Sequence, residues 1–282
     1  MALPIIATHA GNVSVNEIGH IIALVEKNGP VFLLILARTF GLTLQAPFYS
    51  GKSLPAQVRA TLIVALSMMY MITVNPKPPP IPSNYILYSI LLIQEILIGV
   101  IFGFCASILV SAIQAAGELI DVQMGLSMVM LFNPQTKTQS SATGKLFYQI
   151  ELMVFIIAHG HLYLLAAFFG TFEMLPMGTF KFDIIAMTEF IKICGKLFYV
   201  AIQMALPILI VLFIIDFSLG ITNKVSPQIN VLELNFAMKP TTGMLILLIL
   251  MSSIVSMMSE YTGDMVKDSL SAIRAIAKKP SQ

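Results

Sequence analysis

The chain has 282 residues, of which 57% are hydrophobic and only 11% are charged. Soluble globular domains carry roughly 25% charged residues, and the mean hydropathy here is +0.88, which argues against a water-soluble enzyme. A net charge of +2 without any basic tract gives no basis for nucleic-acid binding. Because the apolar runs are long and do not alternate, we predict an all-α, polytopic helical membrane protein.

Six long apolar segments are predicted along the chain, preceded by a weakly amphipathic stretch. The third and fifth exceed the ~20 residues needed to cross a bilayer, so we expect some segments to be broken or hairpin-like. In chain order the six are Val31–Phe48, Val58–Val74, Tyr85–Ala116, Leu146–Phe172, Ile184–Ile221 and Thr241–Met258. We therefore predict a membrane-embedded domain over residues 1–258 and a short polar C-terminal tail over residues 259–282.

Ionisable side chains inside the apolar segments are the first candidates for function, because charge in lipid is costly. They indicate either a proton or ion relay or pairing between helices, and pairing is the interpretation that we favour. Arg38 needs a partner, which Glu95 or Asp216 can supply, while Glu189 and Lys192 are three residues apart and are predicted to pair along one helix face. The predicted structural polar seam consists of Arg38, Glu95, Glu151 and Asp216, and Lys196 completes the set of intramembrane charges.

A polar face follows directly after the apolar third segment. Gln114, Glu118, Asp121 and Gly125 are separated by steps of four, three and four residues, which places them on one side of a helix. Polar groups in that position should meet water or a partner rather than lipid. We assign Gln114, Glu118, Asp121 and Gln123 to a face that contacts an aqueous pore or a partner subunit; the alternative is a solvated helix end.

A cluster of bulky apolar residues lies in the polar connection that follows. It consists of Met128, Met130, Leu131 and Phe132 and ends at Asn133-Pro134. One interpretation is a patch of the core. The other is a deformable hydrophobic constriction, because flexible Met side chains can close around a passing chain and an apolar narrowing excludes ions.

Catalytic and metal-binding patterns are not found in the sequence. His159 and His161 flank Gly160, and a two-residue step rotates a helix by about 200°, which points the two rings apart. No protease-like serine and aspartate spacing is present, and Cys105 and Cys194 both lie in apolar stretches. We therefore expect no enzyme activity, no cofactor and no metal.

Several motifs, taken in their order, resemble the FliR family of flagellar biosynthesis proteins and their T-type counterparts in injectisomes. The resemblance covers roughly Val31–Met258. Its blocks are Leu54-Pro55-Ala56-Gln57-Val58-Arg59, Gly117-Glu118 through Gln123-Met124-Gly125-Leu126-Ser127 with Asn133-Pro134, Gly160-His161-Leu162 with Leu175-Pro176-Met177-Gly178, Pro227-Gln228-Ile229-Asn230-Val231, and the apolar segment after Lys239. The chain departs from the family at Met128 and Leu131, where aromatic residues are common, and at Asn235–Lys239.

The resemblance implies a non-enzymatic subunit of a type III protein export gate in the bacterial inner membrane, at the flagellar basal body. Such a subunit assembles with P-type and Q-type subunits into a closed helical ring, next to a B-type (FlhB-like) switch subunit and membrane lipid, and unfolded flagellar proteins pass through the ring. The loop after Gly125-Leu126-Ser127 would be the pore plug. Two alternatives stay open: a virulence-type injectisome subunit, and a proton-coupled secondary transporter that uses Glu95, Glu151 or Asp216.

Overall fold

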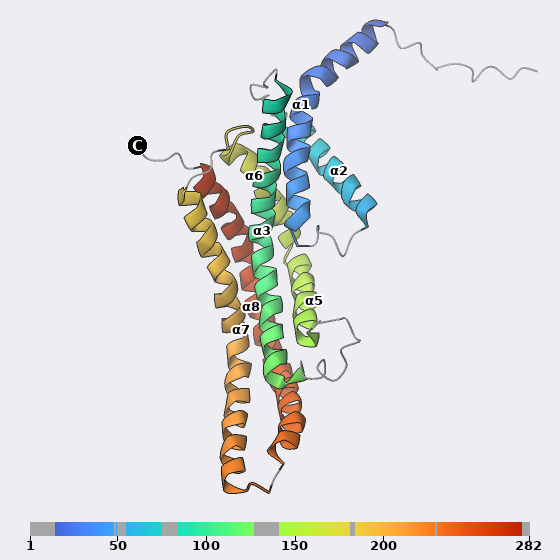
Figure 1. Cartoon of the computed structure of the whole chain (residues 1–282). Helices are drawn as coiled ribbons and strands as arrows, with labels where there is room; N and C mark the ends of the chain where they lie inside the picture. The colour runs from blue at the N-terminus through green and yellow to red at the C-terminus, as the bar shows by residue number, and fades with distance from the viewer. Residues whose placement is uncertain are drawn as a thin grey trace, which may run out of the picture.

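The computed structural model describes residues 15–47, 49, 55–74, 84–126, 141–180, 184–228 and 230–277, and the described part is an elongated bundle of helices (Figure 1). Within it the all-α prediction is confirmed. The helices are α1 (Val15–Gln45), α2 (Ala56–Val74), α3 (Tyr85–Met124), α5 (Ala142–Ile157), α6 (Gly160–Met174), α7 (Ile184–Val225) and α8 (Val231–Ala277).

Helix α3 forms the centre of the bundle and contacts α1, α5, α7 and α8. It has 40 residues, which at 1.5 Å per residue gives a length of about 60 Å. Asn84 caps its start by accepting a hydrogen bond from the backbone N–H of Ile86. Gly125 ends the helix with a left-handed φ of 78°, a conformation that glycine adopts at little cost.

Helices α7 and α8 form a long antiparallel hairpin beside α3 (Figure 1). Their 42 and 47 residues exceed what the ~30 Å hydrocarbon core of a bilayer requires. The structure differs here from the expected polar tail, because α8 continues to Ala277 and buries Met265, Ala272 and Ile273. These residues recur at helical spacing and pack inward, while charged residues such as Lys267 occupy the outer face.

The fourth apolar segment is divided into α5 and α6, which meet at an angle of 72°. The break falls at His159, whose φ of 56° is left-handed and is uncommon for a residue other than glycine. Gly160 follows it at a tight contact, where an added Cβ would lie 2.5 Å from the ring of Phe155 and 2.9 Å from Thr262.

Four of the described helices are long and apolar enough to cross a membrane, and the bent α5–α6 pair raises the number to five. The four are α2, α3, α7 from Met187 onward, and α8. Six segments were expected from the sequence. The difference is the first segment, which lies in α1, where the apolar run is short and interrupted by Arg38.

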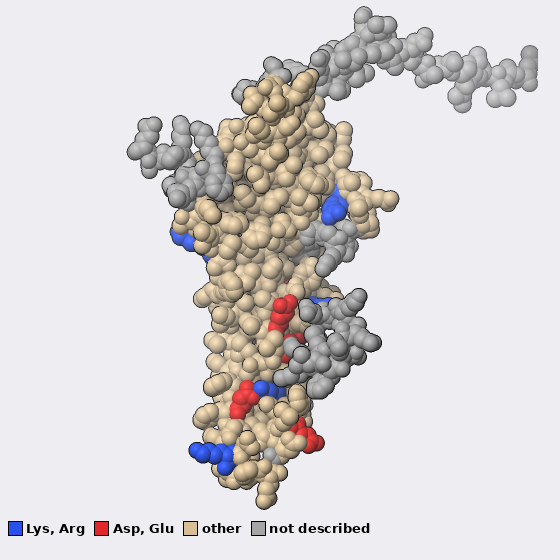
Figure 2. Space-filling model, in the orientation of Figure 1, with Lys and Arg blue, Asp and Glu red and all other residues tan. Residues whose placement is uncertain are grey.

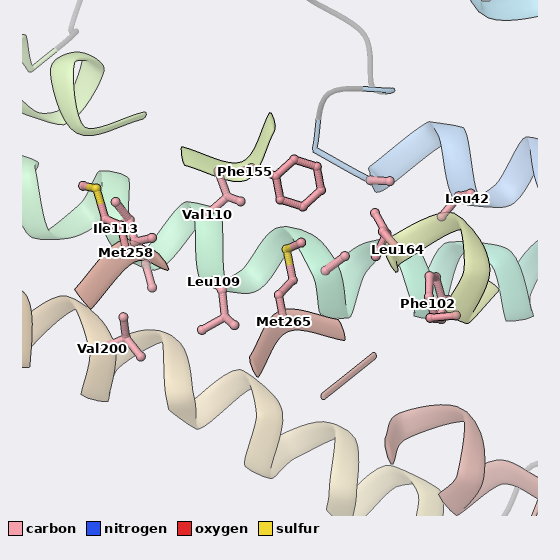
Figure 3. Packing of buried hydrophobic residues seen from close by; sticks show 14 of the residues in the cluster. Leu42, Phe102, Leu109, Val110, Ile113, Phe155, Leu164, Val200, Met258 and Met265 are labelled. Carbon is pink, nitrogen blue, oxygen red and sulfur yellow. The ribbon is translucent and has the colours of Figure 1, made fainter. Parts of the chain in front are cut away.

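The core is built around α3, with packed side chains on both sides of this helix (Figure 3). In the close view Val110 and Ile113 of α3 lie near Phe155 of α5 and Met258 of α8. Such contacts are close-packed, and in a membrane this packing rather than removal from water holds helices together.

Helix α2 lies to one side of the bundle and buries little of its surface (Figure 1). Tyr70 is its main anchor, since its ring stacks on Phe172 at 4.4 Å and on Phe169 at 5.3 Å between centroids. Most of the face in Figure 2 carries no charged side chain, and its acidic residues lie in the lower half.

Candidate functional site

The most completely buried polar contact joins Arg38 of α1 to Glu95 of α3. Both side chains are 0% exposed, and the Arg38 Nε donates to Glu95 Oε2 at 2.6 Å. A second guanidinium nitrogen donates to the backbone carbonyl of Leu175 at 3.1 Å, and the guanidinium carbon lies 4.1 Å from the centre of the Phe172 ring. The other Glu95 oxygen accepts from the backbone N–H of Gly178 at 3.0 Å. This ion pair therefore links α1, α3 and the turn after α6.

The backbones of α1 and α3 approach closely enough for this pair because glycines line the crossing. A Cβ added to Gly41 would lie 2.2 Å from the carbonyl oxygen of Ile96, and one added to Gly99 would lie 2.0 Å from the carbonyl oxygen of Arg38. Small residues at helix crossings are the usual means of such close packing in membranes. The position of the ion pair is thus set by the sequence on both helices.

Asp121 forms a second buried contact, between α3 and α5. Its side chain is 2% exposed and accepts hydrogen bonds from the Ser141 hydroxyl, the Thr143 hydroxyl and, at 3.0 Å, the Thr143 backbone N–H. Ser141 is the N-cap of α5 and also accepts from the Gly144 N–H at 2.7 Å. A carboxylate at a helix N-terminus satisfies free N–H groups and complements the helix dipole.

In the structure, the side chains of the predicted polar face of α3 therefore lie in different surroundings. Asp121 faces the interior of this chain rather than a pore or a partner, because the start of α5 takes up its acceptors. Glu118 stays exposed and accepts from Gln114 Nε2 at 2.9 Å. Gln123 turns to α7, where its amide donates to Asp216 at 3.0 Å.

A third polar contact lies near the end of α3. Lys239 of α8 pairs with Asp216 of α7 at 2.5 Å, and Gln123 donates to the other oxygen of the same carboxylate. Asp216 is thus paired with Lys239, so Glu95 is the partner of Arg38. Since Glu95 and Gln123 are 28 residues apart on α3, the contacts lie about 40 Å apart along the helix. The four residues of the predicted seam therefore occupy three separate places, with Arg38 and Glu95 together and Glu151 and Asp216 each elsewhere.

The remaining intramembrane charges are paired within the chain, with the exception of Glu151. Lys192 pairs with Glu189 at 2.6 Å, which confirms the pairing predicted from their spacing. Lys196 of α7 pairs with Asp268 of α8 at 2.6 Å. Glu151 has no cationic partner within the described ranges, and its only hydrogen bond is with the Thr262 hydroxyl at 3.3 Å.

The predicted plug residues Met128, Met130, Leu131 and Phe132 lie outside the described residues. Their segment leaves α3 after Leu126 and re-enters the described chain at Ser141, so the Asp121 contact joins the two helices that flank it. Across residues 28–126, 141–180 and 187–277, as far as they are described, no group of three or more His, Cys, Asp and Glu side chains is arranged to hold a metal ion.

Sequence reasoning missed several partners of these contacts. Ser141 and Thr143 carried a usable signal, because a Ser followed by a small-residue turn before an apolar run marks a helix start. Lys239 and Asp268 carried none, since their partners lie on other helices.

These features define a polytopic helical membrane protein whose intramembrane charges are mostly neutralised within the chain. The chain belongs to the family described as Bacterial export proteins, family 1, whose model matches residues 30–265. The resemblance recognised from the sequence motifs is thereby confirmed. The protein is a membrane component of a bacterial export apparatus.

Individual relatives agree with this assignment. The chain is 29% identical over 220 residues to the flagellar biosynthetic protein FliR of Escherichia coli (strain K12), covering 77% of this chain and 82% of that protein. It is 29% identical over 232 residues to FliR of Bacillus subtilis (strain 168), covering 80% and 87%. It is also 27% identical over 229 residues to the Yop proteins translocation protein T of Yersinia pestis, again covering 80% and 87%.

Proposed function

We propose that this chain is a non-enzymatic subunit of the flagellar type III export gate and forms, with P-type and Q-type subunits, the channel through which unfolded flagellar proteins cross the bacterial inner membrane. The observation that carries the proposal is the family match over residues 30–265, together with the relatives named FliR. The B-type switch subunit is the further partner that we propose, at the flagellar basal body.

The surface of the bundle supports a role inside an assembly. Large apolar side chains such as Phe198, Phe213 and Phe217 are exposed along α7, and Met68 and Ile72 are exposed on α2. Lipid can cover part of this area, but helices longer than the bilayer also need protein around them. Half-buried Gln114 and exposed Glu118 lie on the same long α3 and supply polar contacts of the kind that lipid cannot satisfy.

The assembly is tested by purification of the tagged chain from native membranes with mild detergent. We expect the P-type and Q-type subunits to co-purify in fixed ratio. Substitution of Glu118 by Leu should weaken this co-purification, whereas Glu189→Leu, at a locally paired surface position, should leave it unchanged. Recovery of the chain as a homo-oligomer without other small membrane proteins would contradict the proposal and favour a transporter.

We propose that Met128, Met130, Leu131 and Phe132 form the plug of this channel. The proposal is supported by their apolar character within a polar connection and by the Asp121 contact, which holds together the two helices that flank the segment. Deletion of Met128–Phe132 should preserve assembly but make cells that carry the whole gate permeable to small ions. An unchanged ion conductance in assembled gates would refute the plug.

A virulence-type export apparatus is the second candidate, because the translocation protein T of Yersinia pestis matches as much of the chain as the flagellar relatives do. The two are separated by a strain that lacks this chain. Loss of swimming and of hook and filament export, restored by a plasmid copy, supports the flagellar role. Intact swimming with lost secretion of effector proteins supports the virulence role.

A further inference from the structure

Glu151 differs from the other buried carboxylates of the bundle. Its side chain is 1% exposed, and Oε2 has no hydrogen-bond partner among the described residues. Glu95 and Asp268 each pair with a cation, and Asp121 accepts three hydrogen bonds. A carboxylate in the position of Glu151 would be the least stabilised charge in the bundle.

In the contact between Glu151 and Thr262, the Thr262 hydroxyl has no second hydrogen to donate to the carboxyl group. A threonine hydroxyl has one hydrogen, and the Thr262 oxygen lies closer to its own-helix acceptor, the Met258 carbonyl at 3.0 Å, than to Glu151 Oε1 at 3.3 Å. When the hydroxyl donates to Met258, its oxygen is an acceptor toward Glu151. A neutral carboxylic acid fits this arrangement, because its own O–H can donate to the Thr262 oxygen.

Among the described residues, no cation is placed to neutralise a charged Glu151. Helix α3 presents the stretch Ala106–Ile113 to the core, and this stretch contains no ionisable residue. On α6 the ring of His161 lies 6.5 Å from the rings of Phe155 and His159, and its Nδ1 is buried without a partner among the described residues.

On α8 the buried Asp268 is already paired with Lys196 of α7, and the other charged residues near Thr262 are exposed. Lys267 is 79% exposed and pairs with Asp264 at 3.1 Å, and Glu260 lies on the exposed face of the helix. Glu151 therefore has no cation within reach on any of the three helices packed against α5.

A hollow of about 370 Å³ lies beside this contact, between the α5–α6 break and α8. Gly160 and Tyr163 line one side, and Thr262, Gly263 and Lys267 line the other. The hollow thus reaches Thr262, the one side chain that hydrogen-bonds to Glu151. Its volume is enough for several water molecules, each of which occupies about 30 Å³ in the liquid.

We propose that Glu151 is a proton-binding site. Its carboxyl group is held as the neutral acid, with the O–H directed to the Thr262 oxygen, and it exchanges this proton with water in the hollow between α6 and α8. Loss of the proton leaves a buried carboxylate that is solvated only when α8 moves away from the α5–α6 break. Proton binding is therefore coupled to the α5–α8 contact, whatever the protein exports.

The proposal is tested with dicyclohexylcarbodiimide on the assembled complex in native membranes. The reagent adds the O–H of a carboxylic acid across one of its C=N bonds, so it modifies protonated carboxyl groups in apolar surroundings. We expect mass spectrometry to find the adduct on Glu151 at neutral pH and to find less of it as the pH rises. Glu151→Gln should abolish the adduct, and Glu189→Gln, at an exposed pair, should retain it.

Infrared spectroscopy provides the second measurement, independent of reagent access. The difference between the original complex and Glu151→Gln should contain the carbonyl band of a protonated carboxyl group at neutral pH, and Glu151→Gln, which mimics the neutral acid, should assemble normally. Absence of that band overturns the proposal. So does a complex that assembles with Glu151→Asp but fails with Glu151→Gln, because a site that holds the neutral acid should accept the neutral amide of similar size.

Discussion

The Arg38–Glu95 contact permits a quantitative prediction. Arg38→Met removes the cation but keeps most of the apolar stem, and it leaves Glu95 buried at 0% exposure without its 2.6 Å partner. Breaking one side of a buried ion pair destabilises a protein by about 3–5 kcal/mol. Glu95→Met should cost a similar amount, because it strands the guanidinium in the same place.

The double variant Arg38→Met with Glu95→Met removes both charges together. It still loses the hydrogen bonds to the Leu175 carbonyl and the Gly178 N–H, and each unpaired buried group costs about 1–3 kcal/mol. The double variant should therefore be less stable than the original protein but more stable than the sum of the single changes. We expect a coupling free energy of at least about 2 kcal/mol, since charged partners in contact couple by roughly 0.5–3 kcal/mol.

The assay is detergent-induced unfolding of the co-expressed complex, followed by helicity, for the four members of the cycle. Lys192→Met serves as the control, because its pair with Glu189 is solvent-accessible and such pairs contribute about 1 kcal/mol or less. The account predicts that the two single changes are not additive in the free energy of unfolding. Additive effects, or a loss of stability no larger than that of the control, would refute the claim that this pair holds α1, α3 and the turn after α6 together.

Two further predictions concern the helix crossings. Asp121→Asn should lower the free energy of unfolding by about 1–3 kcal/mol, because it weakens charge-assisted bonds to the start of α5, whereas Asp264→Asn at the exposed face should have little effect in the same unfolding assay. Gly99→Ala places a methyl group against the Arg38 carbonyl oxygen, so the overpacking should cost about 1–3 kcal/mol; Gly195→Ala, with open space around it, should be tolerated, and equal stability of the two glycine variants would contradict the described α1–α3 crossing.

Much of the helical architecture follows from the sequence alone. Helix α2 ends at Val74 and α3 begins at Tyr85, as the apolar runs predict, because an Asn N-cap and a proline-rich connection mark these limits locally. The α5–α6 break was not predicted. It depends on the left-handed φ of His159 and on the fit of Gly160 against Thr262, and Thr262 belongs to another helix.

The partners of the charged side chains could be predicted from the sequence only where both lie on one helix. The pair between Glu189 and Lys192 was predictable because a helix sets their separation. The choice between Glu95 and Asp216 as partner of Arg38 was not, since it depends on which helices meet. The sequence predicted a polar tail at the end of α8 because charged residues recur there, although its apolar residues repeat at helical spacing.

The most direct test of the central claim is site-specific photocrosslinking in cells in which an exported flagellar protein is arrested during passage. A photoreactive phenylalanine analogue is placed at Met130, in the proposed plug, and, as the control, at Ile157, which is 76% exposed on the outside of the bundle. The proposed function predicts a crosslink from position 130 to the arrested exported protein and none from position 157. Crosslinks to the arrested chain from neither position, in cells whose gate is assembled, would contradict the claim that this chain lines the export path.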